Sequence, residues 1–249
     1  MLRSTRASAL HAAIPSTAPS VASLGWLCAF DAKLLSADSD GRQFPSLKGN
    51  NAVQTDAAKK PKAGNFGCGG TSLLYDGVND ATPVDMSAIV GKTKLTYYAV
   101  YMRLAAGAGA NIFETTTGFF SQNGIVLGNT TAGQPVVGQG AASSGNTRTF
   151  SEVLLGERVV IAGTLDRTVA GTIATRGFYQ GIEPAAYGAT NTTNPTGTFA
   201  VATGSWIGSR NNGTSAQFPG YVCFVGVRDG IDDDATVRRI CATLACAWR

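Results

Sequence analysis

Residues that could catalyse a reaction are scarce in this 249-residue chain. The only histidine is His11, and the four glutamates are Glu114, Glu152, Glu157 and Glu183. A glycosidase needs two carboxyl groups that flank the bond it cleaves, and the nearest acids along one strand pattern, Glu157 and Asp166, stand too far apart. A Ser-His-Asp triad needs a histidine within the folded body. We therefore expect a protein that is not an enzyme.

Sugar binding is a second kind of chemistry that the residue types allow. A sugar has an apolar face and many hydroxyls, so lectin sites combine an aromatic platform with polar side chains and sometimes calcium. The candidate carbohydrate-binding residues are Trp206, Arg210, Asn211, Asn212 and Tyr187. The structural alternative, which we favour, places Trp206 in the core and makes Asn211-Asn212-Gly213 a turn.

The sequence contains only weak indications of a metal site or of a disulfide. Asp76, Asn79 and Asp80 could hold calcium, although a turn explains them as well. We expect no other cofactor, because the five cysteines have irregular spacing that does not fit a zinc site. Cys68, in a glycine-rich loop, and Cys246, near the C-terminus, are the candidates for an intermolecular disulfide, with free thiols as the alternative.

The composition indicates strands joined by turns as the elements that position these residues. Charged residues make up 14% of the chain and there are 31 glycines, a balance that disfavours helices. Apolar patterns predict strands, and clusters of acids and apolar residues predict one helix over 232–244. The expected strands are 26–32, 72–75, 95–104, 111–116, 124–128, 157–166, 172–180, 198–203, 205–209 and 221–228. Polar residues in 36–70 and 184–197 predict surface loops, and those in 129–148 predict an extended loop or a weak hairpin.

The N-terminal segment, the basic residues and the apolar runs indicate which kinds of partner the chain could bind. Residues 1–23 contain Arg3 and Arg6 and no acid, which predicts an extended N-terminal arm that lies on a partner, followed by one domain over 24–249. The basic stretch 59–62 lacks interleaved aromatic residues, so we expect no nucleic-acid partner. The apolar runs are too short to span a bilayer, so we expect no membrane partner.

Three groups of short motifs follow one another along the chain. They are 29–32 with 74–80, then 157–166 with 177–181, then 206–210 with 218–224 and 231–244. In this order they resemble the concanavalin A-like lectin/glucanase superfamily, and in particular the laminin G-like domains of phage and bacterial surface proteins. One departure is Gln180, where such domains usually have asparagine.

The resemblance covers roughly residues 24–247 and implies an all-β fold. This fold is a two-sheet antiparallel jelly-roll sandwich with one short C-terminal helix, here preceded by the extended arm. Laminarinase-type members of the superfamily carry an E-x-D-x-x-E motif, which this chain lacks because neutral residues follow Glu114 and Glu152. Fold alone does not decide function, since the superfamily includes glycosidases, lectins and structural modules.

Low charge, the acid-free arm and the missing catalytic set together favour a structural role. We predict a non-enzymatic structural protein on a virion surface, a phage capsid decoration or minor capsid protein. Its arm would anchor it to other virion proteins, such as the major capsid protein or tail and neck proteins, as a homo-oligomer or bound to the assembly. The alternative is a lectin-like, carbohydrate-binding module of a phage tail or fibre that recognises host surface glycans.

Overall fold

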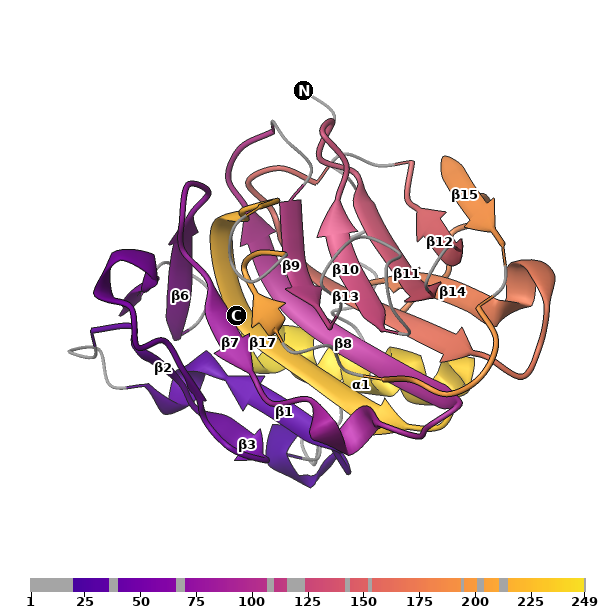
Figure 1. Cartoon of the computed structure of the whole chain (residues 1–249), viewed down its shortest axis with the longest axis horizontal. Coiled ribbons are helices and arrows are strands. Elements are labelled where there is room, and N and C mark those ends of the chain that lie inside the picture. The colour runs from indigo at the N-terminus through magenta and orange to yellow at the C-terminus, as the bar shows by residue number, and fades with distance from the viewer. Residues whose placement is uncertain are drawn as a thin grey trace.

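The computed structural model describes most of the chain between Ser20 and Trp248. The residues outside this description are 1–19, 36–39, 66–69, 107–109, 116–123, 142–143, 152–153, 194, 201–203, 211–214 and 249. The described residues form two large antiparallel sheets packed face to face, with one α-helix behind the first sheet (Figure 1). The prediction of an all-β sandwich with a short C-terminal helix is confirmed.

The first sheet carries the helix on its outer face. Its strand order is β14-β13-β8-β17-β1-β3, and β17 also pairs with β6, which in turn pairs with β5. The strands are β1 (Cys28–Asp31), β3 (Ser46–Lys48), β5 (Lys62–Asn65), β6 (Thr71–Asp76), β8 (Lys94–Arg103), β13 (Arg158–Asp166), β14 (Thr175–Tyr179) and β17 (Pro219–Asp229).

The second sheet lies in front of the first in Figure 1 and has the order β15-β12-β11-β10-β9-β16-β7. Its strands are β7 (Thr82–Val84), β9 (Ala110–Glu114), β10 (Ile125–Asn129), β11 (Pro135–Ala141), β12 (Ser144–Thr149), β15 (Ala189–Thr192) and β16 (Ser205–Ile207). A separate small sheet pairs β2 (Gln43–Phe44) with β4 (Ala52–Val53). The 3-10 helices are η2 (Val21–Ser23), η3 (Ala32–Leu34), η4 (Ala57–Lys59), η5 (Ser87–Ile89) and η6 (Gly171–Ala174).

Strand β8 occupies the centre of the first sheet because both of its faces are apolar. It pairs with β13 on one side and with β17 on the other, and its residues from Leu95 to Tyr101 are all buried. Tyr97 reaches across the core, where its hydroxyl lies 3.2 Å from the carbonyl of Val126 in the second sheet. Tyr98 points to the opposite face, and its hydroxyl donates to Asp232 just before the helix, at 2.7 Å. The predicted central strand is confirmed.

Helix α1 (Asp234–Ala247) packs on the outer face of the first sheet. The Asp233 carboxylate accepts a hydrogen bond from the backbone N–H of Thr236 at 2.7 Å and so caps the N-terminus. The apolar side chains at helical spacing are buried, as the sequence predicts: Val237, Ile240, Cys241 and Leu244. Among the described helices, none is both long and apolar enough to cross a membrane.

Two segments predicted as loops contain strands, since β2 to β5 lie within residues 36–70 and β15 lies within 184–197. The segment 129–148, predicted as a loop or a weak hairpin, contains β11 and all but the last residue of β12, which form a hairpin. The hairpin strands are rich in Gly, Ser, Thr and Asn, so they lack the apolar alternation that indicates a strand. In the expected strand over 198–203, the described residues 198–200 are not a strand, although Phe199 is fully buried.

The predicted arm falls almost entirely outside the described residues. Only its last residues are described, and there η2 contacts helix α1. The indole N–H of Trp26 donates to the carbonyl of Val21 at 2.7 Å, and the half-buried Val21 side chain packs against the core. The end of the predicted arm that the structure describes is therefore attached to the body of the sandwich.

Candidate functional site

Trp206 lies on the outer face of the second sheet. Its neighbour Ile207 is fully buried and pairs with Phe113, another core residue. Because successive side chains of a strand point to opposite faces, Trp206 faces outward, opposite Glu114 on β9 and Pro83 on β7. Its side chain is half-buried and is not among the residues that pack against the core. The interpretation of Trp206 as a core residue is therefore wrong.

The indole N–H of Trp206 makes no hydrogen bond within the described structure. This nitrogen is buried and has no hydrogen-bond partner. A buried N–H without a partner costs free energy, and indole nitrogens in proteins usually find an acceptor. The ring and its N–H thus combine an apolar surface with an unused donor.

Glu114 and Asn111 form a polar pair beside Trp206. Strand β9 has a bulge, so Glu114 lies opposite Val126 and Asn111 lies opposite Gly128 on the neighbouring strand β10. Val126 and Gly128 share one face, and therefore Asn111 and Glu114 share it too, although they are three residues apart. The Asn111 amide donates to the Glu114 carboxylate, and both side chains are buried.

Two glycines next to this pair, Gly128 and Gly138, lie where the outer face has no room for a larger side chain. A Cβ atom at Gly128 would lie 2.7 Å from the Asn111 side-chain oxygen, and one at Gly138 would lie 2.5 Å from a methyl carbon of Thr147. Larger residues at either glycine would collide with these neighbours. The face beside Trp206 is thus built from short side chains.

The other carbohydrate candidates lie in two places. Arg210 is half-buried and lies four residues after Trp206, where it bridges to Ser215, while Asn211 and Asn212 lie outside the described residues. Tyr187 precedes β15 at the far edge of the second sheet, and four strands separate β15 from β16. At about 4.8 Å per strand this is roughly 24 Å. Arg210 therefore lies in the segment that directly follows the strand of Trp206, whereas Tyr187 belongs to a different part of the sheet.

Tyr187 is part of a hydrogen-bonded cluster at that edge. Its hydroxyl donates to the Glu183 carboxylate at 2.8 Å and accepts from the backbone N–H of Gly177 at 2.9 Å. Glu183 also accepts from Arg176, and the Tyr187 ring packs edge-on against Phe150 with centroids 6.0 Å apart. These contacts position the loop before β15.

The calcium candidates form a closed turn. One carboxylate oxygen of Asp76 accepts from the backbone N–H groups of Val78, Asn79 and Asp80 at 2.7 to 3.3 Å. Asp80 in return accepts from the N–H of Asp76 at 2.8 Å, and burial raises the pKa of Asp80 to about 6. Within the described part of the chain no three side chains of His, Cys, Asp or Glu gather around a common point. The geometry is that of a hydrogen-bonded turn.

The described cysteines are thiols. Cys28 is buried and donates to the sulfur of Met86 at 3.5 Å, and burial raises its pKa to about 12. Cys223 and Cys241 are buried, and Cys246 is half-buried. These four cysteines form no disulfide with one another, and Cys68 lies outside the described residues.

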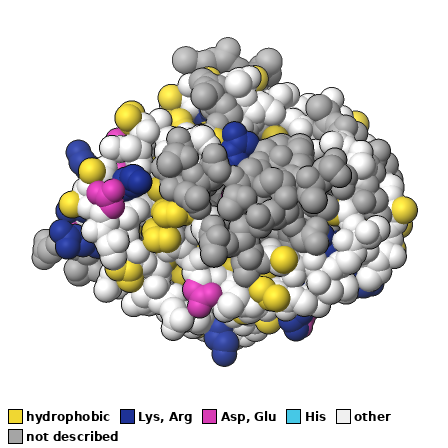
Figure 2. All heavy atoms as spheres, in the orientation of Figure 1, with side chains coloured by type: hydrophobic (Ala, Val, Ile, Leu, Met, Phe, Trp, Pro, Cys, Tyr) yellow, Lys and Arg dark blue, Asp and Glu magenta, His cyan; other side chains and the backbone are white. Residues whose placement is uncertain are grey.

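The basic stretch 59–62 lies among acidic partners. Lys60 lies 3.5 Å from the Asp40 carboxylate, Arg42 lies 2.8 Å from the same group, and Lys59 lies 3.9 Å from Asp56. Figure 2 shows acidic side chains next to basic ones toward the left edge of the view. Lys59, Lys60 and Arg42 each have a carboxylate within 4 Å.

Two stacked antiparallel sheets with a helix on one side define a lectin-like β-sandwich. No family model and no curated protein matches the sequence. Among solved structures, the chain is similar to the Trypanosoma rangeli sialidase in complex with sialic acid, at TM-score 0.61 and 13% identity over 92% of this chain and 35% of that one. The same sialidase with 2,3-difluorosialic acid gives TM-score 0.59 and 13% identity over 90% and 33%.

A NanB sialidase variant from Streptococcus pneumoniae is similar over 67% of this chain and 27% of that one, at TM-score 0.51 and 12% identity. The chain thus spans about a third of the length of these sialidases, and the low identity shows a shared fold. These neighbours contradict the prediction of a virion structural protein on a capsid, which nothing in the comparisons supports. The narrower laminin G-like assignment has no match either.

Proposed function

We propose that this protein is a carbohydrate-binding module whose site is centred on Trp206. The observation that carries the proposal is a tryptophan on the outer face of the second sheet with a buried indole N–H that has no partner. A sugar ring can lie with its C–H groups against the exposed part of the indole. Trp206 thus offers the aromatic surface that a sugar platform requires, and its unpaired N–H would gain an acceptor if binding opened a path to it.

Neighbouring polar groups give this site its chemical preference. Arg210 follows in the same connection, and the Glu114–Asn111 pair lies next to Trp206. Arginine recognises carboxylates by paired hydrogen bonds, so an acidic sugar fits this site. Sialic acid, which the similar sialidase binds, is the first sugar to test.

We expect binding without hydrolysis. The residues opposite Glu114 on the two adjacent strands are Trp206 and Val126, and neither carries a carboxyl group. The Glu114 carboxylate accepts a hydrogen bond from the Asn111 amide, whereas glycoside hydrolysis requires a second acid across the scissile bond.

Binding to a glycan array, followed by titration calorimetry with the strongest ligand, tests the proposal. Trp206→Ala should weaken binding at least tenfold, or about 1.4 kcal/mol, while Trp206→Phe should retain part of the affinity because a ring remains. Tyr187→Phe is the matched control, since this ring lies at the far edge of the same sheet, and its affinity should be unchanged. An array with no signal above background, or equal affinity in Trp206→Ala and the native protein, would overturn the proposal.

Incubation of the native protein with the bound glycan tests the absence of hydrolysis. Chromatography should show intact glycan. Release of a monosaccharide that disappears in Glu114→Gln would mean that the protein is an enzyme after all.

A further inference from the structure

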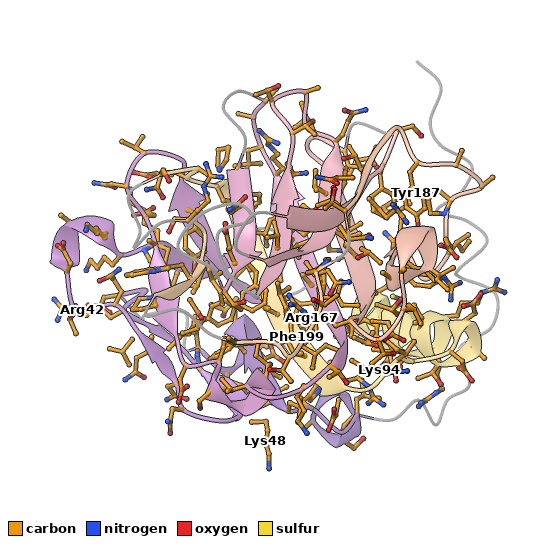
Figure 3. The ribbon with its side chains drawn as sticks, turned by 45° about the vertical axis from the view of Figure 1, so that its right-hand side comes forward. Arg42, Lys48, Lys94, Arg167, Tyr187 and Phe199 are labelled. Atoms are coloured by element: carbon orange, nitrogen blue, oxygen red, sulfur yellow. The ribbon has the colours of Figure 1, made fainter. Side chains whose placement is uncertain are left out.

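Arg167 is a buried arginine that joins the two sheets at one end of the sandwich. It follows β13 directly, and its backbone N–H donates to the carbonyl of Thr93 just before β8, at 2.9 Å. Its side chain crosses to the second sheet, where Nη2 donates to the carbonyl of Gly140 on β11 at 2.6 Å. The guanidinium carbon lies 4.2 Å from the centre of the Phe199 ring, and Figure 3 shows these two side chains next to each other.

The rest of this guanidinium has no hydrogen-bond partner. Arg167 is only 4% exposed, and its Nε and Nη1 atoms are buried without an acceptor. Arginine has five N–H donors and stays charged in proteins. Two of its three nitrogens therefore carry buried donors that no protein acceptor satisfies.

No described carboxylate compensates the charge. The adjacent Asp166 pairs with Lys94 at 3.1 Å and accepts from Thr168. Burial alone lowers the pKa of Arg167, to about 10, so the guanidinium remains protonated at neutral pH. A buried charge without a counter-charge is strongly destabilising, while the Phe199 ring and one carbonyl supply only part of the compensation.

We propose that Arg167 binds a small monovalent anion, a carboxylate or a halide, through its Nε and Nη1 donors. Charge-assisted hydrogen bonds from a guanidinium to an anion are about twice as strong as neutral ones. The anion would neutralise the buried charge and thereby hold β13 and β11 together at this end of the sandwich. This site is separate from Trp206, because β9 and β10 lie between β11 and β16.

Thermal unfolding of the full chain at constant ionic strength tests this site, with chloride, bromide, formate and acetate titrated in separate series. The native protein should gain an increase in Tm of about 3 to 6 °C at ten times the dissociation constant, and Tm should continue to rise with the logarithm of the anion concentration above it. Arg167→Met, which keeps an unbranched apolar side chain, should lose this increase. Arg42→Met, at an exposed arginine paired with Asp40, should keep it, and general salt effects should be equal in all three proteins.

A second measurement uses only the native protein, in case Arg167→Met does not fold. Crystals grown in bromide should show an anomalous peak within hydrogen-bond distance of Arg167 Nε or Nη1, and addition of formate should displace it. A halide response alone or a carboxylate response alone identifies which anion the site takes. Ordered water at Arg167 with bromide only at surface lysines, or the same anion response in Arg167→Met as in the native protein, would overturn the proposal.

Discussion

Substitution of Tyr98 tests how helix α1 is attached to the first sheet. The Tyr98 hydroxyl donates to Asp232 at 2.7 Å, and Asp232 also pairs with Arg228 at 2.8 Å. The backbone N–H of Asp232 meanwhile donates to the Thr96 hydroxyl at 2.9 Å. Asp232, just before the helix, is thus bonded to both β8 and β17. Tyr98→Phe removes a single hydrogen bond from this junction and leaves the ring in place.

The expected loss follows from the charge on the acceptor. A hydrogen bond to a charged group contributes about 1.5 to 3 kcal/mol, and Arg228 still pairs with Asp232 in the variant, so we expect a loss of about 2 kcal/mol. For a chain of this size that lowers Tm by about 4 to 8 °C. Tyr75→Phe is the matched control: its buried hydroxyl bonds to the neutral Thr82 at 2.8 Å, so its loss should be about 1 kcal/mol.

Urea unfolding monitored by circular dichroism measures both variants. A double-mutant cycle of Tyr98→Phe with Asp232→Asn should give a coupling energy of about 1 kcal/mol or more, because the charged hydrogen bond exists only when both native residues are present. Equal losses in the Tyr98 and Tyr75 variants, or a coupling energy near zero, would refute the reasoning.

Three further predictions concern stability. Burial raises the pKa of Asp80 to about 6, above its usual value near 3.9. The stabilising contribution of protonated Asp80 to the folded state is therefore present at low pH and is lost as pH rises through 6. In urea titrations Asp80→Asn should be more stable than the native protein at pH 7.5 and nearly equal to it at pH 4. Asp233→Ala removes the α1 cap and should cost about 1 kcal/mol, with an unchanged Tm as the contrary result. Gly208 has φ +83°, and an added Cβ would lie 2.1 Å from the Tyr75 ring, so Gly208→Ala should lose about 2 to 4 kcal/mol; a soluble variant with native unfolding would contradict this.

The parts of the fold that local patterns determine could be predicted from the sequence. Strand β8 is apolar on both faces, and helix α1 has an acid at its cap and apolar residues at helical spacing. The β11–β12 hairpin could be predicted only as an alternative to a loop, because its polar residues are held by cross-strand pairing such as Gly138 with Thr147. Pairing of this kind depends on distant residues and leaves no periodic signal.

The candidate site was predicted only in part. Residue types identified Trp206 and Arg210, but the side of the sheet depends on register, here on the pairing of Ile207 with Phe113. The Glu114–Asn111 pair was missed because simple alternation places residues three apart on opposite faces, and only the bulge brings them together. The virion prediction was wrong because it depended on low charge, an acid-free arm and a missing catalytic set, features that β-sandwich proteins of many functions share.

Helix α1 and the Trp206 face lie on opposite outer sides of the sandwich. A tether attached after the helix would hold the domain on the side of the first sheet, and the Trp206 indole would then point away from the support. Several copies immobilised in this way would present their platforms in parallel to a sugar-coated surface. If Trp206 binds sugars as proposed, weak individual contacts would add up through effective concentration to durable adhesion.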